Sequence, residues 1–159
     1  EIDVGGVCKK VSAALGKKVT ARNEDSRGNV FILRISRPNS LDVNPPHRDG
    51  YQDVWKRTIN LWVPISGCEK KSSLPIIPGS HLWPESDLIR TKSSSAYIGA
   101  NRYQVPAILQ SRVGLNFIRP NPSYSCALLF TPFLVHGSAI NQLDDTTRIS
   151  LELRLPFAD

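Results

Sequence analysis

Two histidines and one aspartate are the residues of this sequence best suited to bind a metal ion. The first two candidates, His47 and Asp49, flank Arg48 in a segment that begins with two prolines. On a strand, successive side chains point to opposite faces, so His47 and Asp49 share one face while Arg48 points away. The prolines stiffen the start of such a strand without removing a hydrogen bond that it needs. We therefore expect two ligands of one metal ion from this segment.

The third candidate ligand, His136, lies much later in the chain, after the apolar run Phe133-Leu134-Val135. A histidine in that position is expected on an interior strand. Two histidines and one carboxylate occupy three corners of a metal and leave the opposite face open, as in non-haem Fe(II) sites that accept a bidentate ligand and O2. Zinc sites more often add a further histidine or a cysteine. The set His47, Asp49 and His136 therefore favours iron.

The segment from Thr147 to Leu155 carries the candidate for binding an anion beside the metal. Its aliphatic residues alternate strictly and form one face, expected to pack against other elements including an N-terminal helix: Ile149, Leu151, Leu153 and Leu155. Arg148 and Ser150 share the other face. The interval from His136 to Arg148 fits one turn and part of a returning strand, which brings Arg148 back beside the metal. A guanidinium there can hold a carboxylate through two parallel hydrogen bonds, and the Ser150 hydroxyl can add another.

Several other polar and aromatic residues have structural roles as their simplest interpretation. Glu152 and Arg154 lie farther along the Arg148 face, and we expect them to form an exposed or rim ion pair that stabilises the fold little. His81 follows Gly79-Ser80 and is expected to fix that turn rather than bind the metal. The tryptophans are at least as compatible with core packing as with a substrate pocket: Trp55, Trp62 and Trp83.

The elements that position these residues can be read from apolar periodicity. Apolar residues at helical spacing from Val7 to Leu15, followed by Gly16, predict one helix over about residues 3–16. Short apolar runs punctuated by proline and glycine predict strands at residues 30–35, 57–65, 74–77, 127–130 and 148–155. Residues 84–112 look irregular, with one helical turn and a mobile loop at the three serines 93–95. One leading helix and many short strands predict an all-β sandwich or jelly roll, a single domain over residues 1–159 with its core at about 29–156.

Five segments, taken in this order, resemble the phytanoyl-CoA hydroxylase-like dioxygenases. They are His47-x-Asp49, Trp62-Val63-Pro64-Ile65-Ser66, Ile76-Ile77-Pro78-Gly79-Ser80-His81, His136-Gly137-Ser138-x-x-Asn141 and Arg148. The resemblance spans about residues 30–155. The Pro-Gly-Ser-His and His-Gly-Ser-x-x-Asn segments make it more specific than the His-x-Asp pair alone. The chain is short for the family, and it has Ser72-Ser73 where a glycine is common before the Pro-Gly pair.

The resemblance implies a double-stranded β-helix, a cupin-like form of the jelly roll, and an Fe(II)- and 2-oxoglutarate-dependent enzyme. Such an enzyme uses O2 to hydroxylate a small molecule and releases succinate and CO2. It implies that His47, Asp49 and His136 bind the iron. It also implies that Arg148 binds the distal carboxylate of 2-oxoglutarate with Ser138 beside it, and that Arg37 is a basic residue near the site. Related halogenases have a small residue in place of the aspartate, so Asp49 favours hydroxylation.

Composition limits the partners. The net charge is +6, but the basic residues are scattered, so an anionic small-molecule substrate fits better than nucleic acid, for which no module motif is present. No apolar run approaches the roughly 20 residues of a membrane helix. Three cysteines without a C-x-x-C pair suggest neither a disulfide framework nor a zinc site, which favours a reducing, cytoplasmic setting.

Three alternatives remain open from the sequence. A non-catalytic jelly-roll protein that binds a small ligand would keep the fold, although it has no need of all four polar groups. The same oxidative chemistry on a macromolecule would leave the site unchanged. Manganese or zinc can occupy the same three ligands.

Overall fold

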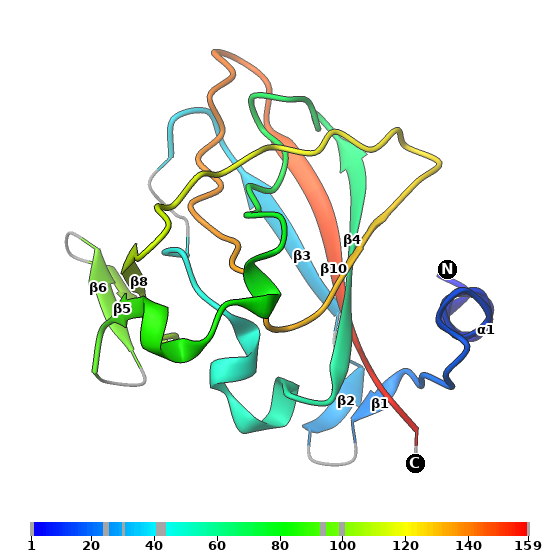
Figure 1. Ribbon diagram of the computed structural model, residues 1–159. Helices are drawn as coiled ribbons and strands as arrows, with labels where there is room; N and C mark the ends of the chain where they lie inside the picture. Colours follow the sequence, from blue (N-terminus) through cyan, green and yellow to red (C-terminus); the bar gives the residue numbers. More distant parts are fainter. Residues whose placement is uncertain are drawn as a thin grey trace.

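A computed structural model of the chain describes residues 2–23, 26–29, 31–40, 44–92, 95–98 and 101–158. The one α-helix among these residues, α1 (Val4–Leu15), lies at the N-terminus and confirms the predicted helix (Figure 1). The Asp3 carboxylate accepts a hydrogen bond of 2.9 Å from the backbone N–H of Gly6, which caps the first turn. Gly16 ends the helix in a left-handed conformation, with φ of 63°.

The centre of the protein is a four-stranded antiparallel sheet in the order β3-β10-β4-β9. Its strands are β3 (Phe31–Ser36), β10 (Arg148–Pro156), β4 (Thr58–Ser66) and β9 (Leu128–Phe130). Four of the five predicted runs therefore form strands, although Val30 lies outside the described residues. The protein is mostly β with one N-terminal helix, as the sequence indicates.

The strand predicted at residues 74–77 is wrong. Within it, only Ile76 makes β-bridges, one to Ile118 and one to His136, and both are isolated. The flanking Pro75 and Pro78 have no N–H to donate, so a continuous ladder cannot extend through this segment.

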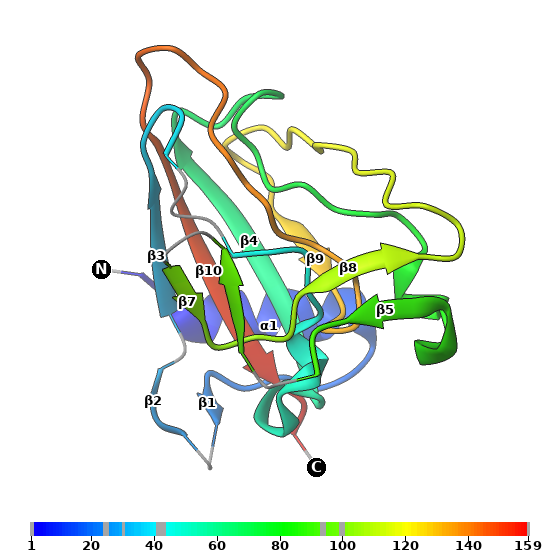
Figure 2. The same ribbon diagram turned by 90° about the vertical axis from the view of Figure 1, so that its left-hand side faces the viewer.

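Residues 84–112 are more regular than the sequence predicts. Their expected helical turn is η4 (Glu85–Asp87), one of four 3-10 turns with η1 (Asp49–Tyr51), η2 (Asp53–Trp55) and η3 (Ser80–Leu82). They also contain two antiparallel ladders, β5 (Leu88–Arg90) with β8 (Ile108–Ser111) and β6 (Ala96–Ile98) with β7 (Asn101–Tyr103) (Figure 2). A third short ladder joins β1 (Arg22–Asn23) to β2 (Ser26–Asn29). The mobile loop predicted at residues 93–95 falls mainly on Ser93 and Ser94, which lie outside the described residues.

One face of the central sheet packs against α1, and the other face carries the side chains of the candidate site. Figure 1 shows α1 on one side of the sheet and the β5–β8 ladder on the other. On the helix side, Cys8 and Val11 of α1 pack with Leu153 and Leu155 of β10 in a buried cluster, as the alternation predicts. The alternate residues of β10 face the opposite side, where the candidate site lies. No helix among the described residues is long and apolar enough to cross a membrane.

Candidate metal centre

The structure brings His47, Asp49 and His136 together in a buried cluster. One ligand atom from each residue lies within 4.8 Å of the other two. The Nε2 atom of His47 is 3.5 Å from Asp49 Oδ1, and the Nε2 atom of His136 is 3.6 Å from Asp49 Oδ2. The three residues predicted from spacing therefore converge on one point.

Main-chain hydrogen bonds fix the two histidines against each other. The N–H of His47 donates to the carbonyl of His136 at 2.9 Å, and the reciprocal bond is 3.1 Å. This pair is an isolated antiparallel bridge rather than part of a strand. Gly137 makes the close approach possible, because a Cβ there would lie 2.4 Å from the carbonyl oxygen of Pro45 and its φ is +123°.

Arg48 separates the two ligands of the first segment in the way that the sequence predicts. Its backbone is extended, with φ of −115° and ψ of 129°, so Asp49 returns to the side of His47 even though it begins η1 rather than continuing a strand. The Arg48 side chain points away and donates to the carbonyls of Ser80 at 2.6 Å and Trp83 at 2.9 Å. Side chains therefore alternate sides over residues 47–49 as they would on a strand, although these residues belong to no strand ladder.

The protonation of both imidazoles suits a divalent cation. Nδ1 of His47 lies 2.7 Å from the carbonyl oxygen of Pro45, and Nδ1 of His136 lies 2.9 Å from that of Leu134. A carbonyl oxygen can only accept, so the hydrogen bonds assign the proton of each neutral ring to Nδ1 and leave Nε2 with its lone pair. Burial, and after it the neighbouring His47, lowers the pKa of His136 to about 4, so the His136 ring is neutral at pH 7.

Asp49 remains ionised between the two rings. Burial alone would raise the pKa of Asp49, but the neighbouring His136, His47 and Arg154 outweigh it and hold this pKa well below its usual range. One carboxylate and two imidazoles whose Nε2 atoms face it form a donor set that fits Fe(II) and other divalent transition metals.

Arg154 and Asn60 support Asp49, which the sequence does not reveal. Arg154 donates to Oδ1 of Asp49 at 2.9 Å through Nη2 and to Oδ2 at 3.3 Å through Nε. Asn60 donates to Oδ2 at 2.6 Å. The guanidinium also lies 4.9 Å from the ring centroid of Trp55. The predicted exposed or rim ion pair between Arg154 and Glu152 is therefore wrong, because Arg154 is only 9% exposed and is bound to Asp49.

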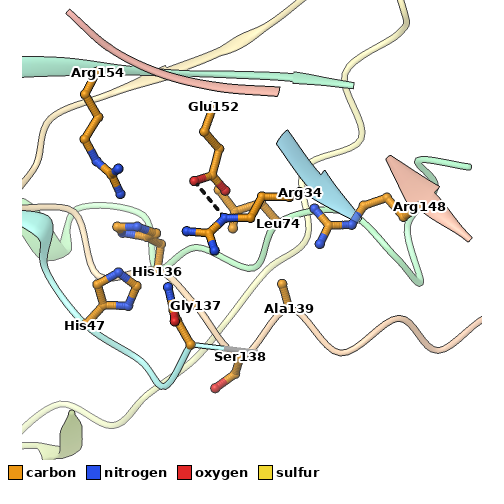
Figure 3. A pocket seen from close by; sticks show the side chains of 11 residues that line it. Arg34, His47, Leu74, His136, Gly137, Ser138, Ala139, Arg148, Glu152 and Arg154 are labelled. Atoms are coloured by element: carbon orange, nitrogen blue, oxygen red, sulfur yellow. Dashed lines mark hydrogen bonds and ion pairs between the residues drawn. The ribbon is translucent and has the colours of Figure 1, made fainter. Parts of the chain in front are cut away.

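A cavity of about 50 Å³ adjoins the cluster of His47, Asp49 and His136, called the metal cluster below because it could hold a metal ion (Figure 3). Its lining includes His47, His136 and Arg154 at one end and Arg148 at the other, with these residues completing it: Arg34, Asn44, Leu74, Gly137, Ser138, Ala139 and Glu152. Ser138 and Arg148 thus lie where the sequence predicts. Both Ser138 and Gly137 have positive φ, which shapes this wall of the cavity.

Arg148 is a buried cation without a carboxylate partner in the described part of the chain. Arg148 is 4% exposed, and its Nη1 donates to the Ser150 hydroxyl at 2.9 Å. Its Nε is buried and has no hydrogen-bond partner among the described residues. Burial lowers the pKa of Arg148, a sign that a bound anion would relieve a poorly solvated charge. Ser150 is fully buried and orients the guanidinium.

The structure does not bring Arg37 to the cavity. Arg37 follows the last residue of β3, its side chain is exposed, and it does not line the cavity. The basic residue that reaches the cavity from this strand is Arg34, whose Nε donates to Glu152 Oε2 at 3.2 Å. Residues of β3 alternate faces, so a basic residue placed three positions later belongs to the opposite face.

The remaining predicted residues have structural surroundings. His81 is exposed in η3 and lies outside the metal cluster, and it is Ser80 that fixes the turn. The Ser80 hydroxyl donates to the carbonyl of Ile77 at 2.7 Å and accepts from the N–H of Val135 at 2.8 Å. Trp62 is fully buried in a core cluster, and Trp83 packs against another.

Comparison with known proteins supports the fold. No protein-family profile matches the sequence, and no curated protein matches it. The crystal structure of AviO1 from Streptomyces viridochromogenes Tue57 superposes with a TM-score of 0.60 at 20% identity, over 94% of this chain and 56% of that one. EvdO2 from Micromonospora carbonacea var. aurantiaca gives a TM-score of 0.44 at 13% identity, over 80% and 52%. This chain spans little more than half the length of either protein, and the similarity to AviO1 concerns the fold alone.

Proposed function

We propose that this chain is an Fe(II)- and 2-oxoglutarate-dependent dioxygenase that hydroxylates a small molecule and releases succinate and CO2. We further propose that its β structure is a jelly roll of the double-stranded β-helix type. One observation carries the proposal. A single cavity has two imidazole Nε2 atoms near a carboxylate at one end and a buried guanidinium lacking a carboxylate partner at the other, within the described residues.

The residues divide into two groups by role. His47, Asp49 and His136 would hold the metal through two Nε2 atoms and one carboxylate. Iron held there would supply the activation of O2 for oxidation of a C–H bond, with 2-oxoglutarate as the electron donor. The open side of the cluster adjoins the cavity that Arg148 closes.

Arg148 would bind the distal carboxylate of 2-oxoglutarate, while Ser150 holds the guanidinium in place and Ser138 lines the wall beside it. Hydrogen bonds to charged groups contribute about 1.5–3 kcal/mol each. The burial of Arg148 makes its interaction with a carboxylate stronger than it would be at the surface. Arg37 has no role in this proposal.

The experiment combines metal binding with turnover. Under anaerobic conditions, Fe(II) and 2-oxoglutarate are added to the protein and the visible charge-transfer absorption of their complex is recorded. O2 and candidate small molecules then follow, with succinate measured. We expect the absorption and substrate-stimulated succinate in the wild type, and neither in His136→Ala.

His81→Ala is the matched control, because it removes an exposed histidine outside the cluster. It should behave like the wild type. Full turnover in His136→Ala would refute the ligand assignment. Formation of the complex without succinate from any substrate would favour a non-catalytic binding protein instead.

A further inference from the structure

An ion pair stands inside the cavity between its two ends. Figure 3 shows the paired side chains of Arg34 and Glu152 between the two histidines and Arg148. The cavity measures about 50 Å³, far below the roughly 300–1,000 Å³ of typical ligand pockets. A ligand that reaches from the metal cluster to Arg148 therefore requires side chains between them to move.

Glu152 is the one acidic side chain among the described residues that line this cavity. The same lining contains three arginines: Arg34, Arg148 and Arg154. Arg154 is already neutralised by Asp49, and Glu152 pairs with Arg34, which leaves Arg148 without a carboxylate partner among the described residues. A carboxylate in the path of an anionic ligand would compete with that ligand for the same guanidinium group.

The ion pair between Arg34 and Glu152 is weak enough for an anionic ligand to displace it. It rests on one hydrogen bond from Arg34 Nε rather than on the two-pronged geometry that makes arginine–carboxylate pairs strong. The Arg34 side chain is 36% exposed and that of Glu152 is 21% exposed, whereas Arg148 is 4% exposed. Partly exposed pairs of this kind contribute little and are screened by water and salt.

The strand register lets Arg34 reach in two directions. In the ladder between β3 and β10, Arg34 lies directly opposite Ser150. Arg148 and Glu152 are two residues to either side of Ser150 on the same face, so both are diagonal neighbours within reach of a long side chain. Arg34 can therefore bind Glu152, as it does here, or a carboxylate held on the Arg148 side.

We propose that Glu152 is a displaceable counter-ion of Arg34 that a dicarboxylate must replace in order to bind, so that it weakens dicarboxylate binding. A dicarboxylate that enters the cavity replaces Glu152 on Arg34, while Glu152 turns towards solvent. A monocarboxylate bound only at the metal cluster leaves the ion pair intact. This inference rests on the proposed function, because it assigns the cavity to the cosubstrate, and it makes Glu152 a residue that lowers cosubstrate affinity without affecting monocarboxylates.

The test measures ligand affinity rather than turnover. Protein loaded with Zn²⁺, which does not activate O2, is titrated by calorimetry with 2-oxoglutarate and with pyruvate. Glu152→Gln keeps the size and the hydrogen-bonding oxygen but removes the charge. We expect 2-oxoglutarate to bind about tenfold more tightly to Glu152→Gln than to the wild type, and pyruvate affinity to change less than about twofold.

Two further measurements keep the test independent of the metal. Glutarate, which lacks the 2-oxo group, is titrated into the metal-free protein, where it should also bind more tightly to Glu152→Gln. Asp53→Asn is the charge-matched control, because Asp53 is 92% exposed and pairs with Lys56 outside the cavity. Glu152→Ala, monitored by thermal unfolding, provides a second variant with the same expected direction.

The outcomes separate this inference from the proposed function. Equal or weaker dicarboxylate binding in both Glu152 variants overturns the inference alone, and so does an equal gain in Asp53→Asn. A gain for glutarate in protein that does not bind a metal supports the inference and refutes the proposed function. No binding of either dicarboxylate to any variant overturns both.

Discussion

Replacing Arg154 with methionine should destabilise the metal-free protein far more than the metal-loaded protein. Arg154 is the cation that contacts Asp49 within the described structure, through both carboxylate oxygens. Without it, a carboxylate that is 3% exposed loses its compensating charge. Breaking a buried ion pair in this way costs about 3–5 kcal/mol. For a chain of this size, that corresponds to a fall in Tm of roughly 6–20 °C.

A bound divalent cation should compensate Asp49 in place of Arg154. The loss in the metal-loaded protein should therefore be less than about half of the loss in the metal-free protein. By linkage, the variant must then bind the metal more tightly, by about thirtyfold if the two losses differ by about 2 kcal/mol. Urea denaturation in EDTA and in saturating Zn²⁺ gives both losses, and calorimetry gives the metal affinity directly.

Arg34→Met is the matched control, since it removes a cation from the same cavity but from a partly exposed pair. We expect it to cost less than about 1 kcal/mol in either condition. If Arg154→Met destabilised the metal-free and metal-loaded proteins equally, Arg154 would be a packing residue and the argument from charge would be wrong.

Three other predictions follow from single contacts. Arg148→Gln should weaken 2-oxoglutarate binding roughly ten- to hundredfold with little change in Zn²⁺ affinity, and calorimetry on the loaded protein would show equal affinities if the assignment were wrong. Gly137→Ala should cost more than about 2 kcal/mol in urea denaturation, because its Cβ meets a backbone carbonyl, whereas Gly79→Ala, with positive φ but open space, should cost about 1 kcal/mol. Finally, the unfolded chain protonates His136 near pH 6.5 and the folded protein only near pH 4. The free energy of unfolding of the metal-free protein should therefore fall as the pH is lowered through that window, with a smaller slope in His136→Gln; equal slopes would contradict the pKa.

The sequence predicts the parts of the site that depend on short-range geometry. His47 and Asp49 share a side because one extended residue separates them, and Arg148 and Ser150 share a face because β10 alternates. The N-terminal helix is predictable for the same reason, since its apolar spacing and terminal glycine are local. That His136 lies beside His47 and Asp49 follows from the four residues taken together with Arg148, and not from the periodicity of any one segment.

The parts that fail depend on register and on contacts between distant segments. The resemblance points to Arg37, whereas the basic residue of β3 that lines the cavity is Arg34, which the strand register sets opposite Ser150. Pairing Arg154 with Glu152 fails because Asp49, which outcompetes Glu152, lies 105 residues away in the chain. The β5–β8 ladder is short, and runs of three or four residues carry little periodic signal.

Strand β10 connects the candidate metal site to α1, although α1 does not itself contact that site. Leu153 and Leu155 pack against α1. Arg154, which lies between them in the sequence, points to the opposite face of β10 and donates a hydrogen bond to Asp49. A change under the helix, such as trimming Val11, would shift the strand and with it the guanidinium. Defects at the N-terminus should therefore emerge first as altered metal retention, before any loss of overall folding is detectable.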